Sequence, residues 1–191
     1  MPAENLRTKI LDGAIALFID KGIDKVTTRE LTEHVGISRS HIYHYFRDWN
    51  ALRLEAVERF MLADLDAFKK AVADCAPDAA LDAFITSLPS THDADWLLYN
   101  SVWTQAQHDQ AYADLAINNM NGWIGLLESV ITAGIGQGLY RQVDAARTAR
   151  ILGGAMNGYA DILSVNPTEA GFREAKEDLR YLVNQLVGRA R

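Results

Sequence analysis

Helical periodicity runs through nearly the whole chain and is the feature that most limits its fold. Between residues 5 and 22, apolar side chains recur at intervals of three and four positions, namely Ile10, Ala14, Leu17 and Phe18. Such intervals place side chains on one face of an α-helix. No convincing run alternates with the period of two that a β-strand requires. The sequence therefore predicts an all-α protein with about nine helices.

Capping residues divide the front of this pattern into short helices. The sequence Thr27-x-x-Glu30 is a capping box, in which the Thr oxygen accepts an unpaired N–H and Glu30 reaches back to the cap. We expect the helix that it opens to end at Gly36. Ser38 is then expected to cap a third short helix over residues 39–45.

Longer helices are expected in the remainder of the chain. Asp48 caps a fourth helix that runs to about Asp74, and Pro77 starts a fifth helix that Pro89 stops. The other expected helices cover residues 93–107 and 109–136, a segment from the cap Asp144 to Val165, and a segment from Asn166-Pro167 to Val187.

Charge is unevenly distributed along the chain. The formal net charge is −6, but residues 1–47 carry seven Lys or Arg against six Asp or Glu. The front is therefore at +1 and the remainder at −7. A slightly basic front on an acidic body fits a small DNA-binding head joined to a body that does not bind DNA. We expect the boundary after Arg47, between residues 1–47 and 48–191.

No targeting or membrane segment is expected. The first ten residues contain Glu4 and lack an apolar region, unlike a secretory signal. The most apolar run, residues 122–136, is short and interrupted by Glu128, so it does not suit a membrane span. The one cysteine, Cys75, cannot form an intramolecular disulfide. These features predict a cytoplasmic protein with no membrane partner.

Two short helices joined by a tight turn at Gly36 form a helix-turn-helix, whose second helix enters the major groove of DNA. With Ile42 and Phe46 facing the core, the polar side chains of that helix face outward. Hydroxyls grip phosphates and Arg can pair with guanine. The candidate DNA-binding residues are Thr27, Thr28, Arg29, Ser38, Arg39, Ser40, His41, Tyr43, His44 and Arg47. The alternative is a polar surface helix of an ordinary α-bundle.

The segment "TTRELTEHVGISRSHIYHYFRDWNAL" resembles the N-terminal domain of TetR-type transcriptional repressors, over roughly residues 7–52. The shared features are the Thr-led second helix, the Gly-apolar-Ser turn and the Y-x-Y-F ending. The part "HYFRDWNAL" is similar to the branch that contains the choline-sensing repressor of the betaine pathway. The resemblance implies a homodimer that reads a pseudo-palindromic operator in double-stranded DNA and releases it when a small-molecule inducer binds.

Two positions depart from the family pattern. Trp49 stands where such repressors commonly place a lysine that contacts a backbone phosphate. Either Arg47 and the helix N-terminus replace that contact, or Trp49 packs on the sugar-phosphate edge. Thr32 stands where the family usually has alanine, which is a change of similar size.

The last two helices carry the candidate dimer residues. The resemblance implies that these helices from two subunits form a four-helix bundle. The last helix has an apolar stripe, and the helix before it has two glycines one turn apart that permit close backbone approach. The candidates are Gly154, Gly158, Phe172, Leu179, Leu182 and Leu186. A core within one subunit could use the same stripe.

Aromatic side chains gather between residues 96 and 123, where Trp96, Tyr99 and Trp103 share one helix face. Ordinary core packing explains such a face, but a ligand cavity with polar anchors also fits. Aromatic rings attract ammonium groups, and Glu128 could neutralise one; a solvated Glu128 is the simpler alternative. The candidate ligand-binding residues for a cationic amine are Trp96, Tyr99, Asn100, Trp103, Asn119, Met120, Trp123 and Glu128.

Catalysis has little support in the sequence. None of the five histidines has a metal-binding spacing, and "GIGQG" lacks a preceding strand and the full nucleotide-binding pattern. We therefore expect no enzyme, no metal and no cofactor. The main hypothesis is a ligand-responsive, DNA-binding repressor. The competing class is a helical enzyme or small-molecule-binding module without DNA binding.

Overall fold

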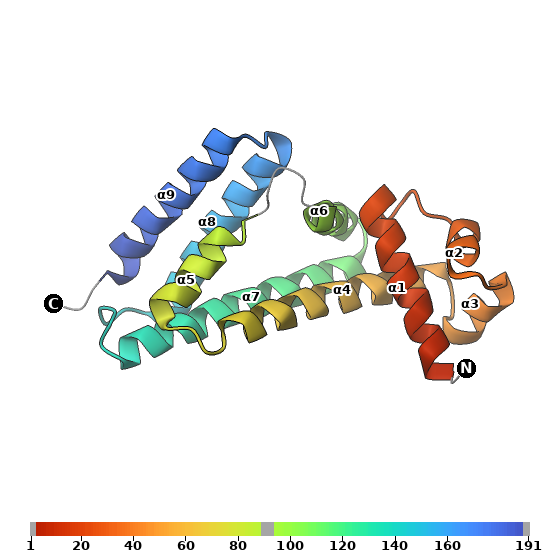
Figure 1. The fold of residues 1–191 in the computed structure, drawn as a ribbon, viewed down its shortest axis with the longest axis horizontal. Helices are drawn as coiled ribbons and strands as arrows, with labels where there is room; N and C mark the ends of the chain where they lie inside the picture. The colour runs from red at the N-terminus through yellow and green to blue at the C-terminus, as the bar shows by residue number, and fades with distance from the viewer. Residues whose placement is uncertain (1–2, 89–93, 189–191) are drawn as a thin grey trace. The chain divides into compact units, whose positions relative to one another are not determined.

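The computed structural model describes residues 3–88 and 94–188, and these residues form nine helices and no β-strand (Figure 1). The predicted all-α class is thus confirmed for the described ranges. The helices are α1 (Ala3–Lys21), α2 (Thr28–Val35), α3 (Arg39–Tyr45), α4 (Trp49–Val72), α5 (Pro77–Thr86), α6 (Ala94–Ala106), α7 (Gln110–Gly136), α8 (Ala145–Val165) and α9 (Glu169–Val187). No described helix has the length and apolarity that a membrane span needs.

Two of the expected caps are confirmed by their hydrogen bonds. The Asp48 carboxylate accepts the N–H of Ala51 at 2.7 Å at the start of α4. The Asp144 carboxylate accepts the N–H of Arg147 at 2.9 Å, and α8 ends at Val165 as predicted.

Other boundaries differ from the prediction. Helix α9 is capped by Thr168, whose hydroxyl accepts the N–H of Gly171 at 3.0 Å, and not by the Asn-Pro pair before it. Helix α4 ends at Val72 rather than near residue 74. Helix α5 ends at Thr86, and the expected stop at Pro89 lies outside the described residues.

The chain packs as two compact units. The first contains α1, α2 and α3, α4 as far as Asp64, α6, and α7 as far as Asn118. Its core includes the fully buried side chains of Ile10, Phe18, Leu31, Ile42, Leu52, Leu98 and Tyr112. Three ion pairs join α4 to α1 or to the turn after it: Glu55 to Arg7 at 2.5 Å, Arg59 to Asp12 at 3.1 Å, and Arg53 to Asp24 at 2.6 Å.

The second unit contains residues 65–93 and 119–191, of which 65–88 and 119–188 are described. Helix α8 packs on α9 and α9 packs on α5. The hydroxyl of Tyr159 donates to Asp178 at 2.6 Å, and Arg180 donates to Asp82 at 2.8 Å. Its core includes Leu81, Phe84, Leu127, Ile131, Leu152 and Val187.

The packing units do not follow the sequence boundary that we expected after Arg47. Helices α4 and α7 each contribute residues to both units, and α6 belongs to the first unit, where it packs on α1. The division into a DNA-binding segment 1–47 and a body 48–191 therefore describes proposed roles and not separate cores.

Candidate functional site

Helix α2 is opened by the predicted capping box. The hydroxyl of Thr27 accepts the N–H of Glu30 at 3.2 Å, and the Glu30 carboxylate accepts the N–H of Thr27 at 2.8 Å. Lys21 also donates to Glu30 at 3.0 Å. These bonds, led by the Thr27 N–H, lower the pKa of Glu30 to about 2. The start of the helix-turn-helix is thus fixed by charge-assisted hydrogen bonds to α1 and to its own first turn.

The turn between α2 and α3 depends on Gly36. Its φ of 75° is left-handed, and its N–H donates to the carbonyl of Thr32 at 3.0 Å. The N–H of Ile37 donates to the same carbonyl at 3.0 Å. A β-carbon is strained at such a φ, so glycine is the residue that fits this turn.

Helix α3 has one buried and one exposed side. Ile42 is fully buried and Phe46, at its C-terminal cap, is nearly so. The predicted outward residues Arg39, Ser40, His41, Tyr43 and His44 are all exposed, with Tyr43 at 42%. The residues predicted to read DNA therefore form one continuous solvent-facing surface on α3.

Ser38 is the N-cap residue of α3, and α3 covers Arg39–Tyr45 as predicted. Ser38 has the backbone position of the cap, but its hydroxyl makes no capping bond. It lies 2.8 Å from the hydroxyl of Ser40 and 2.6 Å from Nδ1 of His41. The neighbouring side chains compete for the hydroxyl, and the result is a polar cluster at the start of α3.

Arg39 and Tyr43 form a second polar pair one turn apart. The Arg39 guanidinium donates to the Tyr43 hydroxyl at 3.4 Å and lies 5.6 Å from the centre of its ring. Hydrogen bonds from Arg39 and then Thr28 lower the pKa of Tyr43 below its usual value. Thr28 at the start of α2 therefore touches the reading helix, so both helices present one polar surface.

Two further candidate DNA-binding residues, Arg29 and Arg47, form surface ion pairs within the chain. Arg29 pairs with Glu33 at 2.8 Å and Arg47 pairs with Asp48 at 2.8 Å, and both arginine side chains are 86% exposed. Surface pairs of this kind contribute about 0–1 kcal/mol, so a phosphate can displace the carboxylate.

Trp49 packs partly against the protein interior. It is half-buried against the first core, with its ring edge-on to Phe18 at a centroid distance of 6.5 Å. Because part of this side chain stays exposed, both alternatives for the phosphate contact stay predictions. Arg47 is the exposed cation next to this point.

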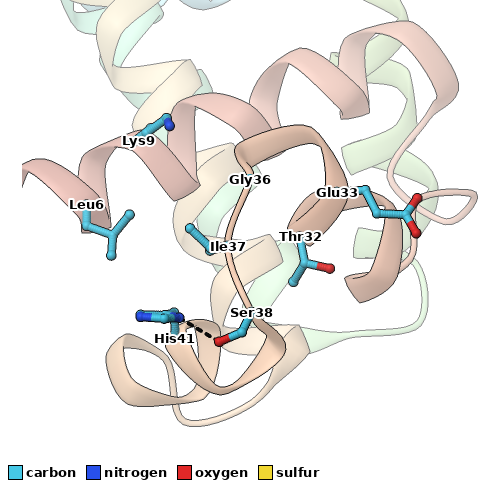
Figure 2. Close-up of a pocket in the computed structure, with 8 residues that line it drawn as sticks. All are labelled: Leu6, Lys9, Thr32, Glu33, Gly36, Ile37, Ser38 and His41. Atoms are coloured by element: carbon cyan, nitrogen blue, oxygen red, sulfur yellow. Dashed lines mark hydrogen bonds between the residues drawn. The ribbon is translucent and has the colours of Figure 1, made fainter.

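A cleft of about 610 Å³ lies in the helix-turn-helix head (Figure 2). It is lined by Leu6, Lys9, Thr32, Glu33, Gly36, Ile37, Ser38 and His41. The ammonium of Lys9 donates to the carbonyl of Val35 at 3.0 Å, which ties α1 to the end of α2. Ser38 and His41 are the two predicted DNA-binding residues at its edge.

The predicted ligand residues fall into both packing units. In the first unit, Tyr99 lies 5.6 Å from Trp96 and 6.2 Å from Trp103 by ring centroids, and we call these three side chains the aromatic trio. Phe60 of α4 lies 5.6 Å from Tyr99. Asn100 is half-buried on the same helix. The sequence analysis missed Asp64, whose carboxylate accepts the Tyr99 hydroxyl at 2.7 Å, because no local pattern links α4 to α6.

The other predicted ligand residues belong to the second unit. Trp123 packs against Phe68 at 5.1 Å and Phe84 at 6.3 Å, which is ordinary aromatic core packing. Asn119 is 6% exposed, while Met120 is exposed and Glu128 is half-buried. The described residues hold no cluster of His, Cys, Asp or Glu that could bind a metal ion.

The predicted dimer residues differ in their exposure. Gly154 and Gly158 are exposed, and a β-carbon added to either would meet nothing within 4 Å. Phe172, Leu182 and Leu186 are half-buried. Leu179 is fully buried within the chain, so its placement on the dimer surface is corrected: it belongs to the intrachain core.

A capped helix-turn-helix with an exposed polar reading helix defines the chain as a helix-turn-helix regulatory protein. Residues 10–56 match the family model of bacterial regulatory proteins of the tetR family. Residues 77–188 match the model of the BetI-type transcriptional repressor C-terminal domain. The chain therefore belongs to the TetR family, with a C-terminal region of the BetI type.

Individual relatives agree with this family. The chain is 50% identical over 46 residues to an HTH-type transcriptional repressor of Mycobacterium tuberculosis, which covers 24% of this chain and 25% of that protein. It is 28% identical over 112 residues to the HTH-type transcriptional regulator BetI of Serratia proteamaculans, which covers 53% and 54%. The alignments thus span about a quarter and about half of these two relatives.

A solved structure shows the same fold. A transcriptional regulator from Saccharomonospora viridis in complex with choline superposes with a TM-score of 0.82 at 20% identity, covering 96% of this chain and 98% of that one.

Proposed function

We propose that this protein is a repressor that binds a pseudo-palindromic DNA operator as a homodimer and releases it when a small molecule binds. The observation that carries the proposal is the solvent-facing polar surface of α3, which is held by the buried Ile42 and Phe46. Such a helix enters the major groove, where Arg39 can pair with a guanine and the hydroxyls can bind phosphates. The role rests on DNA binding and needs no catalytic residue.

The homodimer is supported by exposed apolar side chains on α8 and α9. Ile151, Ile162, Val165 and Tyr181 are between 42% and 86% exposed. Gly154 and Gly158 lie on the same helix as three of them and leave open space for a partner backbone. A second copy of the chain would cover this surface and would set two α3 helices about 34–36 Å apart, one turn of DNA.

We further propose that the inducer is a small cationic amine that binds at the aromatic trio. Tyr99 contacts both Trp96 and Trp103, and aromatic rings attract an ammonium group with about 0.5–2 kcal/mol each. Asp64 supplies a carboxylate beside Tyr99. The choline held by the Saccharomonospora regulator is a ligand of this class. Asp64 is therefore the proposed counter-ion in place of Glu128, which lies in the other packing unit.

The test is a gel-shift titration with DNA from upstream of the gene. Sequence-selective retardation that weakens steeply with salt is expected, since phosphate contacts release counterions. Choline chloride should release the DNA, whereas its uncharged isostere 3,3-dimethyl-1-butanol should not. The absence of any retained fragment at low salt would favour a binding module that does not act on DNA. Release by the neutral isostere at equal concentration would rule out the cationic inducer and leave the repressor role intact.

A further inference from the structure

We propose that Asp24 is the junction through which α6 holds the helix-turn-helix head, with Gln105 and Arg53 as positioning residues for the response to inducer. This inference rests on the proposed function, because it concerns how that response reaches the DNA-binding surface. Asp24 lies in the turn between α1 and α2, and neither it nor its partners belong to the predicted sites.

Two side chains from distant parts of the chain meet on the Asp24 carboxylate. The guanidinium of Arg53 on α4 donates to Oδ1 at 2.6 Å, and the side-chain amide of Gln105 on α6 donates to Oδ2 at 2.6 Å. The sequence separations are 29 and 81 residues. One carboxylate therefore fixes three elements of the first unit to one another.

Buried neighbours attach the turn that contains Asp24 to the start of the helix-turn-helix. Ile23 and Val26 on either side of it are 1% and 3% exposed, and Thr27 of the capping box follows directly. A displacement of Asp24 therefore moves the cap of α2 with it, because little freedom remains between them.

Arg53 anchors the junction to the protein interior. Its side chain is 17% exposed, compared with 62% for Asp24. It lies beside the Tyr112 hydroxyl on α7, where its charge opposes the rise that burial causes in the pKa of that phenol. The Arg53 end of the junction is thus held in the protein interior, and the Gln105 bond is the one that a movement of α6 acts on directly.

Helix α6 links the junction to the proposed inducer site. The aromatic trio and Gln105 lie on the same helix of 13 residues, with Trp103 two positions before Gln105. A helix transmits a displacement along its axis as a stiff element. A ligand that shifts the aromatic trio therefore shifts Gln105 relative to Asp24. Coupling between two sites requires a contact that differs between the ligand-free and ligand-bound states, and the hydrogen bond from Gln105 to Asp24 is such a contact.

The deciding variant is Gln105→Leu, which keeps the size of the side chain and removes the donor. The measurements are the operator Kd with and without choline chloride, and choline binding by tryptophan fluorescence. We define the choline response as the operator Kd with choline divided by the operator Kd without it. We expect Gln105→Leu to lower this response at least about fivefold, while its choline affinity stays within about twofold of wild type. Gln107→Leu, the same change at an exposed position two residues on, should keep the wild-type choline response.

A reversed pair separates positioning from a merely structural role. Gln105→Glu places two carboxylates against each other and should lower the choline response. Adding Asp24→Asn to that variant makes residue 24 the hydrogen-bond donor and residue 105 the acceptor. The double variant should regain at least half of the choline response that Gln105→Glu loses. A role limited to stability would change the melting temperature without this rescue of the choline response.

A second readout needs no inducer. Hydrogen exchange of the residues around Gln105 should slow when operator DNA is added to the wild type, and not in Gln105→Leu, because coupling is reciprocal. If choline fails to release DNA from the wild type, the inducer assignment fails while this readout still tests the junction. The junction proposal alone would be overturned if wild type and Gln105→Leu showed the same choline response and the same slowing of hydrogen exchange by operator DNA. A wild type that binds no DNA would overturn both proposals.

Discussion

The hydroxyl of Tyr99 donates a 2.7 Å hydrogen bond to Oδ2 of Asp64, which joins α6 to α4 across 35 positions of sequence. The bond orients the central ring of the aromatic trio and holds the Asp64 carboxylate at the hydroxyl of that ring. An acid bonded to one of several neighbouring aromatic side chains is a combination that attracts an ammonium group.

Asp64→Asn tests this arrangement directly. The amide can still accept the Tyr99 hydroxyl, so the ring stays oriented while the negative charge is lost. We expect choline affinity to fall about tenfold or more, consistent with a charge interaction of roughly 1–4 kcal/mol. Tryptophan fluorescence titration measures it. Asp66→Asn, an exposed acid on the same helix that pairs with Lys70, is the matched control and should leave choline binding unchanged.

Trp103→Ala tests the aromatic contribution to the ligand response. The variant should keep operator binding and lose its response to choline. Since Trp103 is only half-buried, its truncation should cost less than the roughly 3–5 kcal/mol of a buried tryptophan. Thermal melts and gel shifts separate the outcomes. A strongly lowered melting temperature with a normal choline response in the folded protein would place Trp103 in the core and outside the site.

Arg39→Ala tests the reading surface. Arg39 is exposed, so its loss should leave helicity and dimerisation unchanged while operator affinity falls by about 1–3 kcal/mol, or about 5- to 150-fold. Fluorescence anisotropy with operator and scrambled DNA gives both affinities. Arg173→Ala, an exposed arginine on α9, controls for the loss of one positive charge. Equal losses on operator and scrambled DNA would assign Arg39 to phosphate rather than base contact.

The capping box predicts a specific pH dependence. The folded-state pKa of Glu30 is about 2, below its ordinary 4.5, because the Thr27 N–H and Lys21 favour its charged form. Its contribution to stability is therefore present above about pH 4.5 and is lost as the pH falls toward 2. Glu30→Gln should unfold more easily than wild type near neutral pH, and the difference should shrink through that window.

Urea unfolding at several pH values measures this difference. Thr27→Ala removes the cap itself and should cost about 1 kcal/mol. A difference between wild type and Glu30→Gln that stays constant from about pH 6 to about pH 2.5 would contradict the assigned pKa.

Gly154→Leu tests the proposed dimer surface. A β-carbon added at Gly154 meets nothing within 4 Å in the single chain and the position is exposed, so folding should be intact, but the leucine would occupy the space for a partner. We expect a monomer by light scattering and at least about a hundredfold loss of operator affinity, because a monomer binds only one half-site. Gly125→Leu makes the same change at an open, exposed position on α7 and should remain dimeric.

Local signals in the sequence predicted most of the helices. The capping box at Thr27, the cap at Asp144 and the left-handed Gly36 each act within a few residues, so their effect is readable from the sequence alone. The capping bonds are harder to predict where two local signals compete. Ser38 has neighbouring polar side chains that take its hydroxyl, and Thr168 takes the capping role that the Asn-Pro pair before it suggested.

Long-range contacts carried no comparable signal. Asp64, Asp24 and Gln105 acquire their partners from parts of the chain that are 29 to 81 residues away in sequence. The aromatic residues between 96 and 123 looked like one group, yet α6 and the second half of α7 pack in different units. The fold class was therefore predictable from periodicity, whereas the composition of the ligand site depends on how the helices pack.

The separation of the two sides of α3 has a consequence for how such a regulator can change over generations. Ile42 and Phe46 supply the packing that holds the helix, while Arg39, Ser40, His41, Tyr43 and His44 are exposed and add little to the core. Substitutions at exposed positions usually alter stability by less than about 0.5 kcal/mol. Duplicated copies of this gene can therefore acquire new operator sequences through surface changes alone, and the same five positions form a compact library for redirecting the protein to a chosen DNA target.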